Sequence, residues 1–308
     1  MRRFLALAAV LMLAHPAHAQ PVSCKAQWLR LSETVAGAFG VEAPTPGIVR
    51  ELANGGCRTN GLTFKTDENV SLKAESLQWR GRDMERFVSE GLPPTAFNLE
   101  LSGVRIVPTF GDPTYQYLLD LQSRGQNIEV ELALDWDAAE KVLRVENLLI
   151  SLPNDDFIRY ENRIEGVDLS TKQSLQMSAG SFGMTHSVLV VRSERFFQNY
   201  LLLPLGLALL DGHPNPAARI AELKAEGKAL IAIVPGWLLS SASKAALGDL
   251  LEDLPDPSGT LRIEQRADPG MGVARGMAMA VRIQAMEEVG DLWSLFEGIE
   301  VDVSYERF

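Results

Sequence analysis

The chain has 308 residues and a formal net charge of −11, from 29 basic and 40 acidic side chains. This acidity argues against a nucleic-acid partner, because it repels phosphate groups over long range. Hydrophobic residues make up 46% of the chain, which is enough to bury a substantial core in one domain or two.

The N-terminus has the three-part pattern of a secretory signal peptide over residues 1–19. An arginine pair provides the positive start, an apolar run covers 4–14, and Ala17-His18-Ala19 places small residues where signal peptidase cuts. The apolar run is shorter than the roughly 20 residues that cross a bilayer. We therefore expect cleavage between Ala19 and Gln20, export, and a soluble periplasmic product.

No later segment of the sequence is a candidate for a transmembrane span. The most apolar one, 200–210, is short and contains Pro204 and Gly206. Two alternatives to a cleaved signal stay open. One is an uncleaved N-terminal anchor helix, and the other is a lipoprotein acylated on Cys24.

Cys24 and Cys57 are the two cysteines of the chain. In an exported protein such a pair predicts one disulfide, which would stabilise the fold by roughly 3–4 kcal/mol. Two free thiols are the alternative. A metal site is disfavoured, because the sequence beside the cysteines supplies no further ligands.

Residues 20–60 read as a disulfide-tied helical N-terminal segment. Apolar residues from Trp28 to Val35 repeat at helical spacing, which predicts a first helix. Thr45-Pro46 resembles a helix start and Gly55-Gly56 a helix stop, which predicts a second helix just before the second cysteine.

Residues 61–192 form a β-rich region. The clearest strand is 128–136, where five apolar residues alternate with mainly acidic ones. A turn then leads to a returning strand over 142–150. A helix is expected within 112–125, between the β segments.

Gly103, Gly166 and Gly298 share a pattern of apolar, polar, Gly, apolar, charged and apolar residues. At each glycine the alternation slips by one residue, which is typical of a β-bulge. We predict equivalent bulges in repeated β units, and chance similarity is the alternative.

Residues 193–254 switch to helical periodicity, and 255–308 return to a C-terminal β/α region. The predicted fold class is α+β, with antiparallel, curved or bulged β-sheet units and a helical subdomain packed on them. We expect residues 20–308 to form one integrated domain.

The sequence offers no catalytic, cofactor-binding or metal-binding constellation. His186 and His213 lack further ligands at metal spacing. The run from Ser241 to Lys244 matches the S-x-x-K element of penicillin-recognising enzymes, but that family's K-T-G strand is missing. We expect a noncatalytic protein without a cofactor, and an enzyme with dispersed active-site residues is the alternative.

The segment 196–210 is apolar around most of its circumference. Such a helix must be covered on several sides or meet an apolar partner. One interpretation is a core helix packed on the sheet. The other is a surface, including Leu205 and Leu209, that binds a hydrophobic or lipid-like ligand.

Five short motifs carry a resemblance to known proteins. They are Leu77-Gln78-Trp79, Gly91-Leu92-Pro93-Pro94, Leu134-Asp135-Trp136-Asp137, Glu165-Gly166-Val167-Asp168-Leu169 and Pro257-Ser258-Gly259-Thr260-Leu261. These motifs resemble those of a group of exported proteins of Gram-negative bacteria, especially alphaproteobacteria, that have no established activity. More distantly, the strand-turn-strand units are similar to those of large envelope proteins with long curved sheets, some of which carry lipid in an apolar groove. The resemblance implies an envelope protein that binds a hydrophobic ligand, and it carries over no catalytic residue. A structural module for protein interactions is a further alternative.

The signal pattern predicts that the chain recovered from the periplasm starts at Gln20. Intact mass or N-terminal sequencing checks this. A retained Met1 would support the anchor helix and an acylated Cys24 the lipoprotein, and either result would overturn the prediction.

Overall fold

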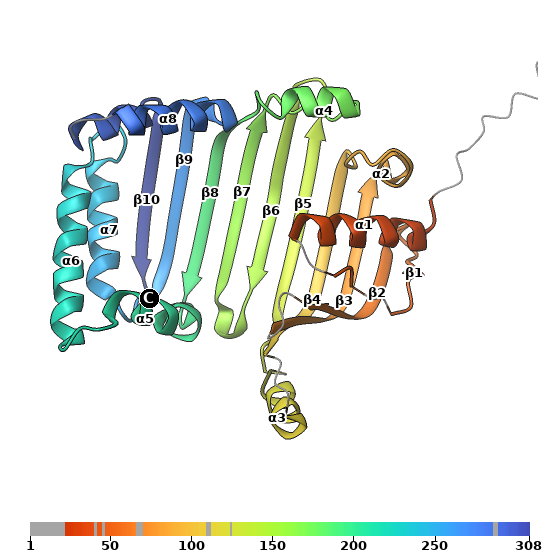
Figure 1. Ribbon diagram of the computed structural model, residues 1–308, viewed down its shortest axis with the longest axis horizontal. Coiled ribbons are helices and arrows are strands. Elements are labelled where there is room, and N and C mark those ends of the chain that lie inside the picture. The colour runs from red at the N-terminus through yellow and green to blue at the C-terminus, as the bar shows by residue number, and fades with distance from the viewer. Residues whose placement is uncertain are drawn as a thin grey trace, which may run out of the picture.

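Ten strands form one open antiparallel sheet, in which every strand pairs with its neighbours in the sequence (Figure 1). The fold is that of a computed structural model, which describes residues 22–39, 42–44, 47–65, 70–108, 112–123, 125–285 and 289–308. The strands are β1 (Arg50–Glu51), β2 (Cys57–Lys65), β3 (Val70–Arg82), β4 (Ala96–Pro108), β5 (Ile128–Asp137), β6 (Val142–Ser151), β7 (Phe157–Glu165), β8 (Gly183–Ser193), β9 (Gly259–Met271) and β10 (Ile299–Arg307).

Helices precede the sheet and fill the connections between its strands, which confirms the predicted α+β class. Because successive strands run in opposite directions, α2, α4 and α8 lie at one end of the sheet, and α3 and α5 lie at the other (Figure 1). The α-helices are α1 (Cys24–Phe39), α2 (Met84–Ser89), α3 (Pro113–Ser123), α4 (Lys172–Ser178), α5 (Leu202–Leu210), α6 (Pro216–Ile233), α7 (Ser241–Asp253) and α8 (Val273–Ala285). Shorter turns are the 3-10 segments η1 (Pro153–Asp155) and η3 (Val289–Phe296), and the π-helical η2 (Phe197–Leu201).

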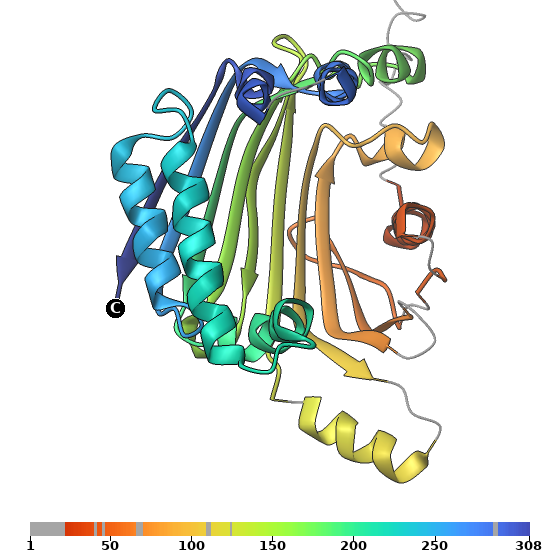
Figure 2. The same ribbon diagram turned by 60° about the vertical axis from the view of Figure 1, so that its left-hand side comes forward.

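The sheet has one apolar face and one polar face. Strand β5 alternates apolar residues from Ile128 to Trp136 with Glu129, Glu131 and Asp135, so its apolar residues share one side. Strand β6 returns beside it, which confirms the predicted pair of strands. A comparison of Figures 1 and 2 places α1, α4, α5 and α6 on one side of the sheet, around its margin.

A disulfide and a tryptophan pair fix α1 on the first strands. Cys24 begins α1 and bridges Cys57 at the start of β2, with the two Cα atoms 5.5 Å apart. The predicted disulfide is thereby confirmed. The ring centroids of Trp28 and Trp79 lie 5.9 Å apart, and Trp79 Nε1 donates to Gln27 Oε1 at 3.1 Å. Both tryptophans are almost fully buried, so they anchor the N-terminal core.

The predicted second helix is wrong. Residues 50–51 form β1, and Gly55 then turns the chain into β2 with φ at 76°, a conformation that glycine adopts without steric cost. Its N–H donates to Leu52 O at 3.0 Å. The Gly55-Gly56 pair is therefore a tight turn between strands, and the disulfide joins a helix to a strand. Thr45 and Pro46 lie outside the described residues.

The prediction of three equivalent bulges holds at one glycine. Gly103 lies in β4 where the pairing with β5 shifts between Leu101 and Val104. Gly166 instead follows the end of β7, and Gly298 precedes the start of β10, so the prediction is wrong there. All three glycines have positive φ, between 63° and 77°. The shared motif thus marks left-handed backbone positions, two of which turn the chain at a strand end.

The last strand meets the segment that leads into α7. Val301 N donates to Leu238 O at 2.8 Å, and Val303 N donates to Ser243 Oγ at 3.0 Å. Both N–H groups belong to the side of β10 that faces away from β9. The opposite border of the sheet is β1, which is only two residues long.

The predicted signal peptide, with its cleavage site at Ala19 and Gln20, lies outside the described residues. Within the described part of the chain, none of the helices combines the length and apolar character that crossing a bilayer requires.

Replacing both Cys24 and Cys57 by Ser should lower the free energy of unfolding by about 3–4 kcal/mol, because the bridge restricts the unfolded chain. Urea unfolding followed by tryptophan fluorescence measures the change, since Trp28 and Trp79 lie beside the bridge. Equal unfolding midpoints for the variant and the oxidised wild type would contradict this stabilising role.

Candidate functional site

The longest insertion in the sheet connects β8 to β9 and carries η2, α5, α6 and α7. A buried carboxylate fixes its starting point. Asp156, in the turn before β7, is 1% exposed and accepts hydrogen bonds from the backbone N–H groups of Glu194 and Arg195. These bonds replace the water that a carboxylate loses on burial, so the insertion leaves the sheet in a defined direction.

Helix α5 begins after a π-helical turn in which Leu202 N donates to Phe197 O. The wide turn lies just before Pro204, which cannot donate to the carbonyl four residues earlier. Helix α5 therefore bends away from β8, and Figure 2 shows it in front of the sheet at one end of the strands.

No residue of α5 is buried. Leu203 is 72% exposed and Leu207 is 63% exposed, whereas Leu205 and Leu209 are 40% and 50% exposed. The interpretation of this segment as a core helix is therefore wrong. An unbroken apolar helix is left open on the surface, and the sequence could not decide this because its periodicity is equally compatible with a core position.

An apolar cleft of about 350 Å³ lies between α5, α6 and the C-terminal end of α7. Helix α5 contributes residues at spacings of three and four, which places them on one face of the helix. Leu205 and Leu209, the two leucines singled out from the sequence, both lie on this face. The lining residues are Phe197, Leu202, Leu205, Gly206, Leu209, Leu210, Ile220, Leu223, Lys224, Leu251, Leu254 and Pro255.

The other two walls of the cleft come from an antiparallel helix pair. Asn215 caps the N-terminus of α6 by accepting from Ala218 N at 3.1 Å, as its place before Pro216 indicates. Gly227 allows α6 to approach α7 closely, because a Cβ there would lie 3.0 Å from a methyl group of Leu251. Leu230 of α6 does not line the cleft and is 64% exposed.

A second apolar surface lies on the sheet itself. The apolar side chains of the central strands are only half-buried and, among the described residues, belong to none of the three buried clusters. Those clusters lie under α1 and α2, beside α4, and next to the segment that precedes α7. The central side chains are Val130, Leu132, Val145, Leu148, Ile150, Ile158, Leu189, Val191 and Ile263.

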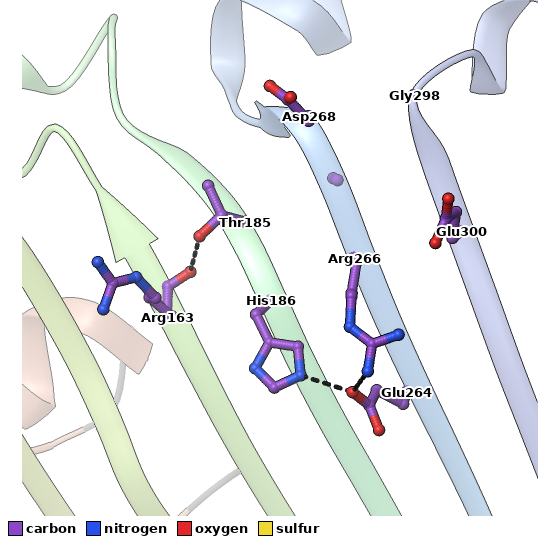
Figure 3. Close-up of a pocket in the computed structure, with 9 residues that line it drawn as sticks. Arg163, Thr185, His186, Glu264, Arg266, Asp268, Gly298 and Glu300 are labelled. Carbon is purple, nitrogen blue, oxygen red and sulfur yellow. Dashed lines mark hydrogen bonds and ion pairs between the residues drawn. The ribbon is translucent and has the colours of Figure 1, made fainter.

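The polar face carries the main alternative site, an open hollow of about 680 Å³ over β7 to β10 (Figure 3). Glu264 is the shared acceptor of its hydrogen-bond network. One carboxylate oxygen lies 3.0 Å from His186 Nε2 and also accepts from Arg266, and the other accepts from Arg262 Nη2 at 2.8 Å. Arg266 also pairs with Asp302 at 3.2 Å.

This hollow has the character of an ion-pair network. Thr185 is its hydroxyl-bearing residue, and its Oγ1 contacts Arg163 O at 3.4 Å and Glu165 at 3.3 Å, not the imidazole of His186. Both oxygens of Glu264 already have donors, so this carboxylate is held in ion pairs and not beside a nucleophile. Among the described residues, no group of three or more His, Cys, Asp or Glu side chains could hold a metal ion.

Residues of the S-x-x-K element make hydrogen bonds at the ends of α6 and α7. Lys244 Nζ donates to Ala232 O at 3.1 Å, at the C-terminal end of α6, and so points away from Ser241. Ser240 caps α7 by accepting from Ser243 N, and Ser243 Oγ accepts from Val303 N. The motif therefore joins α6, α7 and β10, which accounts for its residues without catalysis.

No protein-family model matches the chain, and no curated protein matches it either. The apolar cleft is therefore assessed on its own geometry. Sequence reasoning found its α5 wall but missed Leu251, Leu254 and Lys224, which reach it only through the packing of α6 against α7. Helical periodicity gives the faces of single helices, but not which faces meet.

The hydrogen bonds from Arg262 and then His186 lower the pKa of Glu264 below its ordinary value of 4.5. A depressed carboxylate pKa stabilises the fold above the unfolded-state pKa, and that stability is lost as the pH falls through the folded-state value. Glu264→Gln should therefore destabilise the protein near neutral pH, and the difference in unfolding free energy from wild type should shrink as the pH falls below the ordinary carboxyl pKa of 4.5. Urea unfolding at several pH values measures this difference, and a difference independent of pH would contradict the assignment.

Proposed function

We propose that this protein is an exported, noncatalytic binding protein that holds a hydrophobic, lipid-like ligand between α5, α6 and α7. The observation that carries the proposal is the leucine face of α5, which lines an apolar cleft instead of packing on the sheet. Ligand sites are typically concave, mostly apolar and about 300–1,000 Å³ in volume, and the cleft lies at the small end of this range.

Exposed leucines make such a ligand energetically favourable. Each Å² of apolar surface removed from water contributes roughly 25 cal/mol, and Leu205 and Leu209 keep about half of their surface in water. An alkyl chain in the cleft would cover this surface without unfolding anything. The half-buried apolar side chains on the central strands, framed by α1, α4, α5 and α6, supply further apolar surface nearby (Figure 1).

Export to the periplasm belongs to the same proposal. The Cys24–Cys57 disulfide supports it, because such bonds persist in oxidising compartments. The signal pattern of residues 1–19 points the same way. Kinship with exported proteins of alphaproteobacteria stays a prediction.

A protein-interaction module is the second candidate. Leu203 and Leu207 favour it, because both are largely exposed and neither lines the cleft. Contiguous exposed leucines are typical of a contact surface. The two candidates thus assign function to different faces of the same helix.

Leu205→Trp and Leu209→Trp should each weaken binding of the neutral hydrophobic dye N-phenyl-1-naphthylamine by about tenfold or more, because an indole would fill the cleft. The free energy of unfolding should change by less than about 1 kcal/mol, since both leucines are partly exposed. Fluorescence titration measures binding, and thermal unfolding measures stability.

Leu203→Trp is the matched control on the outward side of α5, and it should leave dye binding unchanged. Failure of the wild type to bind the dye would overturn the proposed function. An equal loss in all three variants would contradict the cleft as the site and favour the interaction surface.

A further inference from the structure

Lys224 is the one charged residue among those that line the apolar cleft. It lies four residues after Ile220 on α6, a spacing that places both residues on one face of the helix. Its hydrogen bond to α7 is solvent-exposed, so the charged end of Lys224 lies in water beside the apolar lining. Its surroundings therefore indicate what the cleft accepts.

The ammonium group of Lys224 donates to Glu252 O at 2.7 Å, at the C-terminal end of α7. That oxygen is a backbone carbonyl, which carries only a partial charge. No carboxylate of the described residues lies within ion-pair distance of Lys224, and the side chain of Glu252 pairs with Lys228 instead. A lysine ammonium has three donors, so two remain for a ligand.

The nearby carboxylates are already engaged. Glu222 and Glu226 both pair with Arg219, at 3.2 and 2.9 Å. Asp253 at the end of α7 accepts from Tyr305 and Arg307. Lys224 therefore shares the nearby charge of Glu252 with Lys228, and among the described residues it has no carboxylate of its own within ion-pair distance.

We propose that the ligand is a single-chain amphiphile with a carboxylate head group, of the fatty-acid type. The alkyl chain lies against Leu205 and Leu209, and the carboxylate pairs with Lys224. This inference rests on the proposed function and specifies the ligand class. A volume of about 350 Å³ suits one chain, and one ammonium balances one carboxylate. A phosphate monoester, with a charge of about −1.5 to −2, would need a second cation.

Displacement of the bound dye by twelve-carbon ligands below their micellar concentrations tests the head group. Dodecanoate should bind about tenfold more tightly than dodecanol, which is the effect of one modest ion pair. Dodecyl phosphate should bind less tightly than dodecanoate, and dodecyltrimethylammonium should bind weakest.

Lys224→Gln should remove the preference for dodecanoate over dodecanol. Glutamine can still donate to Glu252 O, so this carbonyl at the C-terminal end of α7 keeps a hydrogen-bond donor. Lys244→Gln is the matched control, because Lys244 caps the C-terminal end of α6 in the same way without lining the cleft. It should keep the preference.

Several outcomes would overturn the inference. These are equal binding of dodecanoate and dodecanol to the wild type, tightest binding of dodecyl phosphate or of the cation, and equal effects of the two lysine variants. In each case dye binding persists and the proposed function survives. Absence of dye binding would instead overturn the proposed function itself.

Discussion

Strictly sequential strand pairing is the constraint on which the rest of the structure depends. With β1 to β10 side by side in chain order, every covering element after α1 must be inserted between two neighbouring strands or follow the last one. The β3–β4, β4–β5 and β7–β8 connections carry one α-helix each, and these helices lie at the ends of the sheet. The β8–β9 connection is long enough to carry three α-helices, and it holds them beside β10 and in front of the apolar face (Figures 1 and 2).

Much of the fold could be predicted because its signals are local. Alternation identified β5 and the strand that returns beside it, β6, since the face of a strand is encoded within a few residues. The prediction of a second N-terminal helix was wrong, because a Gly-Gly pair such as Gly55-Gly56 can either end a helix or form a turn between strands. The predictions of β-bulges at Gly166 and Gly298 were wrong for a related reason. A motif can encode a positive φ without encoding strand pairing on both sides of the glycine.

The candidate site was predictable in part. Leu205 and Leu209 stood out because a run of leucines without charges is unusual on a surface. Lys224 did not, because a lysine on a helix with neighbouring glutamates reads as an ordinary exposed residue. Its position beside the cleft depends on Gly227, which lets α6 approach Leu251, and on the carbonyl of Glu252. Such contacts between helices leave no periodic trace in the sequence.

The hydrogen bonds along the outer edge of β10 affect how copies of the chain can associate. An open sheet exposes rows of unpaired N–H and C=O groups at its edges, and these can recruit a strand from another molecule and start aggregation. Here Leu238 and Ser243 accept the outward N–H groups of Val301 and Val303, and β1 offers only two residues for pairing. The sheet can therefore stay open at β10 and still resist growth by strand addition at that edge.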